Sequence, residues 1–216
     1  MIEVVSFDID GTLLNREFMD SVWLEEIPRL YAANHKISLK EAKQLVQREY
    51  GAVGDRKLEW YDMKYWLLKF ELDINPLKIL ECKKVLIKLY EEVPGVLQKL
   101  SDKGFRLIII TIAPKEFVDF ELKHTHIDCY FEHVFSATSD FERVKKTGDV
   151  YGKVLRALNV SARKVAHVGD HLDFDFKVPR KLGITSFYLD RSGKSKGELM
   201  IKDLRELESK LIRKHS

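Results

Sequence analysis

The chain opens with IEVVSFDIDGTLL at residues 2–14, an apolar run that ends in aspartates and a glycine. A short run rich in Val and Ile is typical of a strand buried in a parallel sheet. Ligands bind such sheets at the carboxyl ends of the strands, which is where Asp8 and Asp10 follow this run. Two carboxylates at a buried strand end repel each other and lose hydration, so they indicate a bound cation or a titration role. Gly11 lets the backbone turn and approach a ligand closely.

Four further apolar runs predict the other strands of this sheet. Together, the expected strands lie at residues 2–7, 105–110, 134–135, 165–168 and 184–189. From Pro94 onward, strand and helix patterns alternate, which indicates right-handed βαβ units. We therefore predict an α/β fold with a doubly wound, mostly parallel, Rossmann-like sheet. The apolar spacing from Ile201 to Leu211 predicts a final amphipathic helix.

Residues 16–93 carry a different pattern, with no convincing strand and four stretches of helical periodicity. Ser38 followed by Glu41 is a capping-box pattern at one helix start. Asn75 before Pro76 combines a good N-cap with a proline at the first helical position. We predict an inserted four-helix domain here.

The domain boundaries follow from this change of pattern. The α/β core domain is expected at residues 1–15 and 94–216, and the helical domain at residues 16–93. Aromatic residues between Trp60 and Phe70 recur at helical spacing, which favours the core of a helical bundle over the lining of a substrate pocket.

Composition and charge exclude several classes of protein. The 37 basic and 34 acidic residues are spread along the chain and give a formal charge of +3, too balanced for a nucleic-acid-binding surface. No stretch approaches the roughly 18 apolar residues of a membrane helix, and no signal-peptide pattern follows Met1, so we expect a cytoplasmic protein. Cys82 and Cys129 lack the spacing of a zinc site or a disulfide framework, and we expect their role to be packing.

A second acidic cluster, GDHLDFD at residues 169–175, follows the apolar run at residues 165–168. Both clusters therefore fall at the same edge of the predicted sheet. Carboxylate oxygens, together with water and substrate phosphate, are the ligands that Mg²⁺ prefers. We expect Asp170 to bind the metal directly and Asp175 to hold it through bound water, with Asp173 facing solvent.

Two weaker signals fall in the same half of the chain. Thr111 ends the run at residues 105–110, and its hydroxyl and the backbone N–H groups after it suit phosphate oxygens. Lys145 and Lys146 lie just before a helix expected from Thr147, and taken alone they are typical of a surface pair.

Taken in order, these features resemble the four motifs of the haloacid dehalogenase-like superfamily. They are Asp8-x-Asp10-Gly-Thr12, Thr111 after a strand, a lysine before a helix, and Gly169-Asp170 with Asp175. The resemblance spans residues 2–183. The helical insertion falls between the first and second motifs, where phosphatase-type members carry a helical C1 cap.

This resemblance implies a magnesium-dependent phosphoric monoester hydrolase and a role for each matched residue. Asp8 would be the nucleophile that forms an aspartyl phosphate, and Asp10 the general acid and base. Asp8, the Asp10 backbone carbonyl and Asp170 would hold Mg²⁺. Thr111 and Lys145 would hold the transferring phosphoryl group.

The sequence departs from the family pattern at two positions. Ile112 follows Thr111 where the family usually has Asn or Ser, so a side-chain contact to phosphate is missing. Neither Lys145 nor Lys146 precedes the usual proline. Counting back from Tyr151, the aromatic residue expected in the following helix, favours Lys145, with Lys146 as the alternative.

Several functions stay open at this point. A phosphomutase uses the same aspartates, whereas a 2-haloacid dehalogenase does not need the acid at Asp10. A phospho-receiver domain would not carry so long an insertion, and a catalytically silent binding protein would not need every motif residue. The expected partner is a small phosphorylated substrate rather than nucleic acid or a membrane, and the chain is expected to be a monomer or a homodimer.

Overall fold

A computed structural model describes residues 1–212, which form two compact units. Within the described residues, the core unit comprises residues 1–15 and 89–212, and the insert comprises Arg16–Lys88. The return to the core unit comes earlier than the expected position 94. Leu14 and Leu89 form an antiparallel bridge, and the Tyr90 N–H donates to the Leu13 carbonyl at 3.1 Å, so the two connections to the insert leave the core unit side by side.

The core unit is built on a six-stranded sheet whose pairings are all parallel. Its strands are β1 Val4–Phe7, β2 Arg106–Thr111, β3 Phe131–Ser136, β4 Val165–Gly169, β5 Thr185–Leu189 and β6 Met200–Ile201. Their order in the sheet is β3-β2-β1-β4-β5-β6, which places β1 between β2 and β4. The predicted α/β fold with a doubly wound sheet is confirmed.

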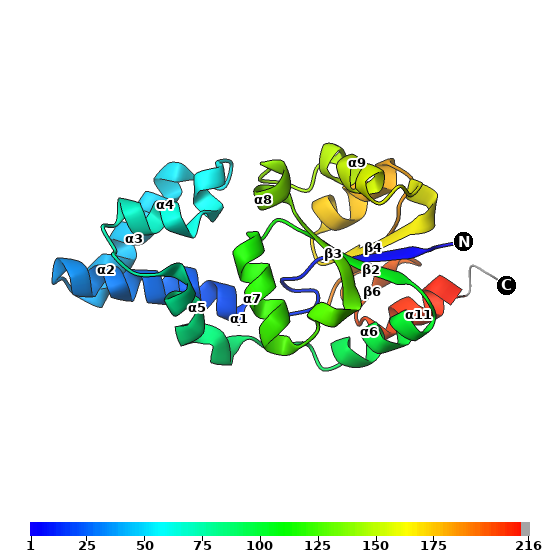
Figure 1. Cartoon of the computed structure of the whole chain (residues 1–216), viewed down its shortest axis with the longest axis horizontal. Helices are drawn as coiled ribbons and strands as arrows, with labels where there is room; N and C mark the ends of the chain where they lie inside the picture. The colour runs from blue at the N-terminus through cyan, green and yellow to red at the C-terminus, as the bar shows by residue number, and fades with distance from the viewer. Residues whose placement is uncertain (213–216) are drawn as a thin grey trace. The chain divides into compact units, whose positions relative to one another are not determined.

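Helices cover both faces of this sheet (Figure 1). The helices of the core unit are α6 Val93–Asp102, α7 Lys115–Thr125, α8 Ala137–Phe141, α9 Gly148–Ala157, α10 Val178–Lys181 and α11 Arg205–Ile212. Val4 of β1 packs with Val150 and Val154 of α9 on one face, while α6 and α11 lie together on the other.

The C-terminal segment differs from its prediction. Ile201 was expected in the final helix, but it lies in β6 and pairs with Leu189 of β5. The helix α11 begins only at Arg205. The Asp203 carboxylate accepts the Arg205 N–H at 2.8 Å, which satisfies a backbone donor at the helix start. A strand of only two residues gives no periodic signal, and so the helical spacing prevailed in the prediction.

The insert is helical throughout. Its elements are α1 Glu17–Ser21, η1 Val22–Glu26, α2 Ile27–His35, α3 Leu39–Val53, η2 Leu58–Tyr61, α4 Met63–Lys69, α5 Pro76–Lys83 and η3 Lys84–Leu86. Ser38 and Glu41 form the predicted capping box at the start of α3. Asn75 accepts the Leu77 N–H at the start of α5, as its sequence indicates.

Aromatic side chains fill the centre of the insert. Trp66 is fully buried, stacks on Phe70 at 5.4 Å between ring centroids, and meets Tyr50 edge-on at 4.5 Å. The Tyr50 hydroxyl donates to the Trp23 carbonyl at 3.2 Å. These contacts bear out the interpretation of this aromatic segment as a bundle core.

Two helices contain a π-helical turn shortly before a proline. The turn η1 precedes Pro28, and the turn η6, Leu172–Lys177, precedes Pro179. Proline has no N–H to donate, and its ring crowds the carbonyl four residues earlier. A wider turn relieves that crowding, because it moves this carbonyl out of the way.

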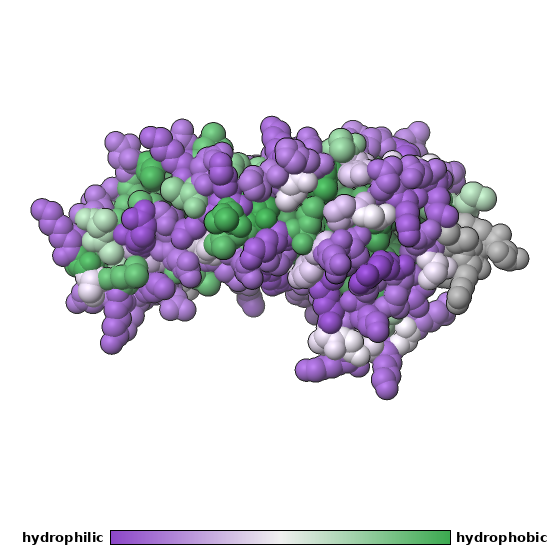
Figure 2. All heavy atoms as spheres, turned by 90° about the horizontal axis from the view of Figure 1, so that it is seen from below, coloured by the Kyte–Doolittle hydropathy of each residue, from purple (hydrophilic) through white to green (hydrophobic). Residues whose placement is uncertain are grey.

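The visible surface in Figure 2 is mainly hydrophilic, with scattered apolar residues. Cys82 and Cys129 are free thiols exposed on the surface, so the expectation of a packing role was wrong. Among residues 1–212, no helix combines the length and apolar character needed to cross a membrane.

Candidate active site

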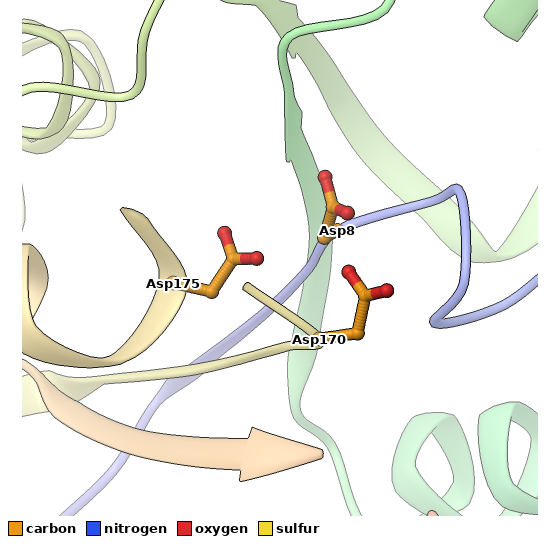
Figure 3. Close-up of side chains that lie close together, drawn as sticks. All are labelled: Asp8, Asp170 and Asp175. Carbon is orange, nitrogen blue, oxygen red and sulfur yellow. The ribbon is translucent and has the colours of Figure 1, made fainter. Parts of the chain in front are cut away.

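Three carboxylates converge at the carboxyl edge of the sheet (Figure 3). Asp8 follows β1, Asp170 follows β4, and Asp175 projects from the turn η6. Each offers a carboxylate oxygen, and these oxygens all lie within 4.8 Å of one another. The Asp8 N–H donates to the Val168 carbonyl at 2.9 Å, which fixes the end of β1 against β4.

A buried lysine joins two of these carboxylates. Lys146 Nζ lies 2.6 Å from Asp8 Oδ1 and also forms an ion pair with Asp175 Oδ1, while only 2% of its side chain is exposed. The neighbouring Lys145 instead has its ammonium over the Phe174 ring, 5.8 Å from the centroid. The geometry therefore favours the alternative, Lys146, over Lys145 as the lysine of the site.

The charges of the site shift one another's protonation. Burial raises the pKa of Asp8 to about 7, with Lys146 opposing the shift and the carboxylates of Asp175 and Asp170 adding to it. Burial alone would also raise the pKa of Asp175, but the Lys146 ammonium and the hydrogen bond from His167 together more than offset this, and the pKa lies below its usual range. Conversely, the two carboxylates hold the pKa of Lys146 above its usual range despite burial. Lys146 is thus a permanent cation in the site.

A buried polar layer lies between the sheet and α9, beneath these charges. The Tyr151 hydroxyl donates to the Phe174 carbonyl at 2.9 Å, so the proton between Tyr151 and His167 belongs to His167 Nε2. Nε2–H then faces Tyr151 at 3.0 Å and Asp175 Oδ1 at 3.2 Å, while Nδ1 accepts from the Ser6 hydroxyl at 2.9 Å. Burial lowers the pKa of His167, which is consistent with this neutral ring.

Asp175 is held from every side. Its Oδ2 accepts the His171 N–H at 3.0 Å, and its Oδ1 accepts from Lys146 and His167. A Cβ at position 169 would overlap the Asp175 side chain, so Gly169 is required for close approach. These three donors engage both carboxylate oxygens of Asp175, which leaves Asp8 and Asp170 as the candidates for direct metal binding.

Thr111 and Asp10 occupy neighbouring parts of the same edge. Thr111 is the last residue of β2 and is buried, and its hydroxyl accepts the Ala113 N–H at 3.2 Å. The loop after it is fixed because the carbonyls of Ile112 and Ala113 accept hydroxyl hydrogens from Thr138 and Ser136, each at 2.8 Å.

Asp10 lies in the turn after β1 and is half-buried. The Gly11 N–H donates to the Leu14 carbonyl at 2.7 Å, which fixes the peptide plane that carries the Asp10 carbonyl. Gly11 has a φ of 82°, a left-handed conformation that favours glycine. Asp173 faces solvent, as predicted, and pairs with Lys177 at 2.8 Å.

Glu121 of α7 is a further acid that the sequence did not reveal. It is fully buried, and neither carboxylate oxygen has a hydrogen-bond partner among residues 1–212. Burial, with a smaller effect from the Asp10 charge, raises its pKa well above the usual range, so its neutral form is favoured. It lies on the buried face of α7 beside Leu122, and a single acid on an apolar helix face gives no motif.

The Ser6–His167 pair was also missed, although a signal exists. The two residues are register partners on β1 and β4, and each is the polar residue in an otherwise apolar strand. A polar pair at facing positions of two predicted strands indicates a buried hydrogen bond.

Comparison with known proteins finds a matching family and several relatives of similar sequence. A family model described as haloacid dehalogenase-like hydrolase matches residues 2–183. Glyceraldehyde 3-phosphate phosphatase from Pyrococcus abyssi is 30% identical over 206 residues, covering 87% of this chain and 81% of the relative. A GMP/IMP nucleotidase from Escherichia coli is 25% identical over 169 residues, covering 78% of this chain and 74% of the relative.

Solved structures share the fold over nearly the whole chain. A HAD phosphatase from Thermococcus onnurineus has a TM-score of 0.83 and 27% identity, with 97% of this chain and 98% of that chain covered. A 2-haloacid dehalogenase from Pseudomonas syringae pv. Tomato has a TM-score of 0.69 and 21% identity, covering 99% of each chain, a likeness of fold alone.

Proposed function

We propose, from the premise that this chain belongs to the haloacid dehalogenase-like hydrolases, that it is a magnesium-dependent phosphatase acting through an aspartyl phosphate on Asp8. The observation that carries the proposal is the contact of Asp8 with Lys146 beside two further carboxylates. A carboxylate that attacks an anionic phosphate needs nearby cations, because they offset the repulsion between the two negative groups.

The donor set fits Mg²⁺. Asp8 and Asp170 offer carboxylate oxygens at one edge, and no sulfur or imidazole belongs to the cluster of Asp8, Asp170 and Asp175. We propose that Asp8, Asp170 and the Asp10 carbonyl would hold the metal, with Asp175 acting on it only through water and through Lys146. Bound there, the metal would supply Lewis-acid stabilisation of phosphate charge.

Each step then follows from residues of this chain. An Asp8 carboxylate oxygen attacks phosphorus while the bond from phosphorus to the ester oxygen breaks, and Asp10 gives that oxygen a proton. A water molecule next attacks the phosphorus of the aspartyl phosphate while the bond from phosphorus to the Asp8 oxygen breaks, and the water gives one of its protons to Asp10. The products are the alcohol and inorganic phosphate, and Asp8 is free again. We propose Lys146, together with Thr111, as the group that holds the phosphoryl oxygens throughout.

Asp10 supports phosphoryl transfer over dehalogenation, because a halide leaves without being protonated. Two relatives are named for small phosphate esters, a nucleoside monophosphate and a triose phosphate. We therefore propose a small phosphomonoester as the substrate.

The test is magnesium-dependent release of phosphate from an aryl phosphate and from a panel that includes nucleoside monophosphates and triose phosphates. Wild type is compared with Asp8→Asn and with wild type in excess chelator. We expect turnover only in the wild type with metal, because Asn cannot form the covalent intermediate. Phosphate release that persists in Asp8→Asn would contradict the mechanism. Magnesium binding without any turnover would favour a mutase or a silent binding protein.

A further inference from the structure

Arg191 lies in the loop after β5, and every nitrogen of its guanidinium group has a partner. Nε donates to the Gly11 carbonyl at 3.2 Å, and one terminal nitrogen donates to the Thr12 carbonyl at 2.7 Å. The other terminal nitrogen pairs with Glu92 at 2.8 Å. The guanidinium carbon Cζ also lies over the Tyr90 ring, 3.4 Å from its centroid. Four contacts on one planar group define both its position and its orientation.

These contacts concentrate on the turn that carries Asp10. The carbonyls of Gly11 and Thr12 are the two that follow the Asp10 carbonyl along the chain. Within the turn, the N–H groups of Thr12, Leu13 and Leu14 all donate to the Ile9 carbonyl, which leaves the next carbonyls turned outward. Arg191 is the side chain that binds them.

Glu92 makes the arrangement rigid from the opposite side. Its side chain is 5% exposed, and it belongs to the segment through which the chain returns to the core unit. Because Leu14 bridges Leu89, this segment runs beside the Asp10 turn. The buried charge of Glu92 would be costly without Arg191, so the pair and the turn depend on each other.

From this geometry we propose that Arg191 is a positioning residue for Asp10. It holds the turn so that the Asp10 carboxyl meets the oxygen of the leaving group, and it does not itself touch phosphate. The proposal rests on the proposed function, in which Asp10 protonates that oxygen.

Two esters with different leaving groups distinguish a positioning role from a purely structural one. Loss of structure would lower kcat/KM on both esters equally, whereas misplacement of Asp10 would lower it mainly on the ester that needs a proton. An alkyl phosphate needs a proton on its leaving oxygen, whereas a dinitrophenyl phosphate loses a stable anion without one. Since kcat/KM reports the step that breaks the ester bond, it isolates proton donation from later hydrolysis. General acid catalysis contributes about 10²–10⁴-fold, and a misplacement of about 1 Å can lose about 10²-fold.

The experiment measures kcat/KM for both esters in wild type, Arg191→Gln, Asp10→Asn and a matched control, Arg106→Gln. Arg106 forms a bidentate pair with Glu132 at the opposite end of β2, at 2.7 and 2.8 Å, and does not approach the site. For Arg191→Gln we expect about a 10²-fold loss on the alkyl ester and less than about a threefold loss on the dinitrophenyl ester. Arg106→Gln should lose less than about twofold on either.

The outcomes separate this proposal from the proposed function. Equal losses on both esters in Arg191→Gln, or no loss on either, would overturn the positioning role while Asp10→Asn still shows the leaving-group dependence. If Asp10→Asn itself lacks that dependence, the acid role of Asp10 falls, and this proposal falls with it. Arg191→Lys, which keeps the charge near Glu92 but lacks the planar fork, should show an intermediate, ester-dependent loss. It carries the test if Arg191→Gln does not fold.

Discussion

The π-helical turns η1 and η6 each hold one buried carboxylate near a lysine, yet they serve different ends. In the insert, Glu26 pairs with Arg29 at 2.6 Å and with Lys83 at 3.4 Å. Hydrogen bonding from Arg29 lowers the pKa of Glu26 below its usual range, and the Arg29 side chain is 57% exposed. This carboxylate has its own cations, with solvent nearby.

At the sheet edge, Asp175 shares a single lysine with a second carboxylate. Lys146 is buried and pairs with both Asp175 and Asp8, and Asp170 lies alongside. The cluster therefore keeps more negative than positive charge. A π-helical turn thus supplies a carboxylate to a neutralised ion-pair cluster in one unit and to the candidate active site in the other, and the number of carboxylates per cation distinguishes the two.

The largest expected difference is in how kcat responds to loss of the lysine that pairs with each buried carboxylate, Lys146 with Asp175 and Lys83 with Glu26. Lys146→Met should lower kcat about 10³-fold, because it removes a fixed cation aimed at the phosphoryl group. Lys83→Met should change kcat less than about twofold, and Lys145→Met less than about threefold, since neither ammonium contacts Asp8. Steady-state kinetics on the preferred ester, with circular dichroism to verify folding, checks this. A larger loss in Lys145→Met than in Lys146→Met would reverse the assignment of the lysine.

The two carboxylates should also differ in what they contribute to stability. Asp175→Asn should lower the free energy of unfolding by about 3 kcal/mol, because it leaves the buried His167 Nε2–H without a charged acceptor and the buried Lys146 ammonium with Asp8 as its charged acceptor. Glu26→Gln should lower it by about 1 kcal/mol, since its partners reach solvent. Urea unfolding of both variants measures the difference. Equal losses would mean that the burial of the partners does not matter.

Metal affinity should depend on pH at the open site. Because burial raises the pKa of Asp8 to about 7, protons compete with Mg²⁺ below that pH. The apparent Kd for Mg²⁺ should rise about tenfold per pH unit as pH falls below 7, and level off above it. Calorimetric titration of the metal-free protein between pH 5.5 and 8.5 measures this. A flat Kd across that range would show that Asp8 is already ionised.

The smallest expected effect concerns Glu121, a buried acid whose carboxylate has no hydrogen-bond partner among residues 1–212. Above its usual pKa near 4.5, the unfolded chain releases the proton while the folded state keeps it, so the free energy of unfolding falls as pH rises. Glu121→Gln removes this loss and should stabilise the protein by about 1–2 kcal/mol at pH 7.

Urea unfolding at pH 4 and pH 7 tests the Glu121 prediction, and the gain in Glu121→Gln should disappear at the lower pH. A variant that is less stable than wild type at pH 7 would mean that Glu121 is ionised and paired.

The fold and the acidic edge of the site were predictable because they depend on local rules. Asp8 and Asp170 each end an apolar strand, and parallel strands bring such ends to one edge. Which of Lys145 and Lys146 belongs to the site was not predictable, because the loop before α9 has no periodicity that indicates which side chain is buried. The buried hydrogen bonds of His167 were not predicted for a related reason. Its partners Ser6 and Tyr151 are distant from it in sequence and meet it only in the folded protein.

Strand β1 leads to Asp8 and lies between β2 and β4, and this position has a consequence for folding. Val4 pairs with Arg106 on one side and with Val165 on the other, so both neighbours of the strand that leads to Asp8 lie far along the chain. Contacts of such high sequence separation form slowly, because the chain loses the entropy of closing a long loop before the contacts stabilise it. We expect the insert, whose contacts are local, to acquire structure first, and Asp8 to meet Lys146 only after the β1–β4 pairing has closed.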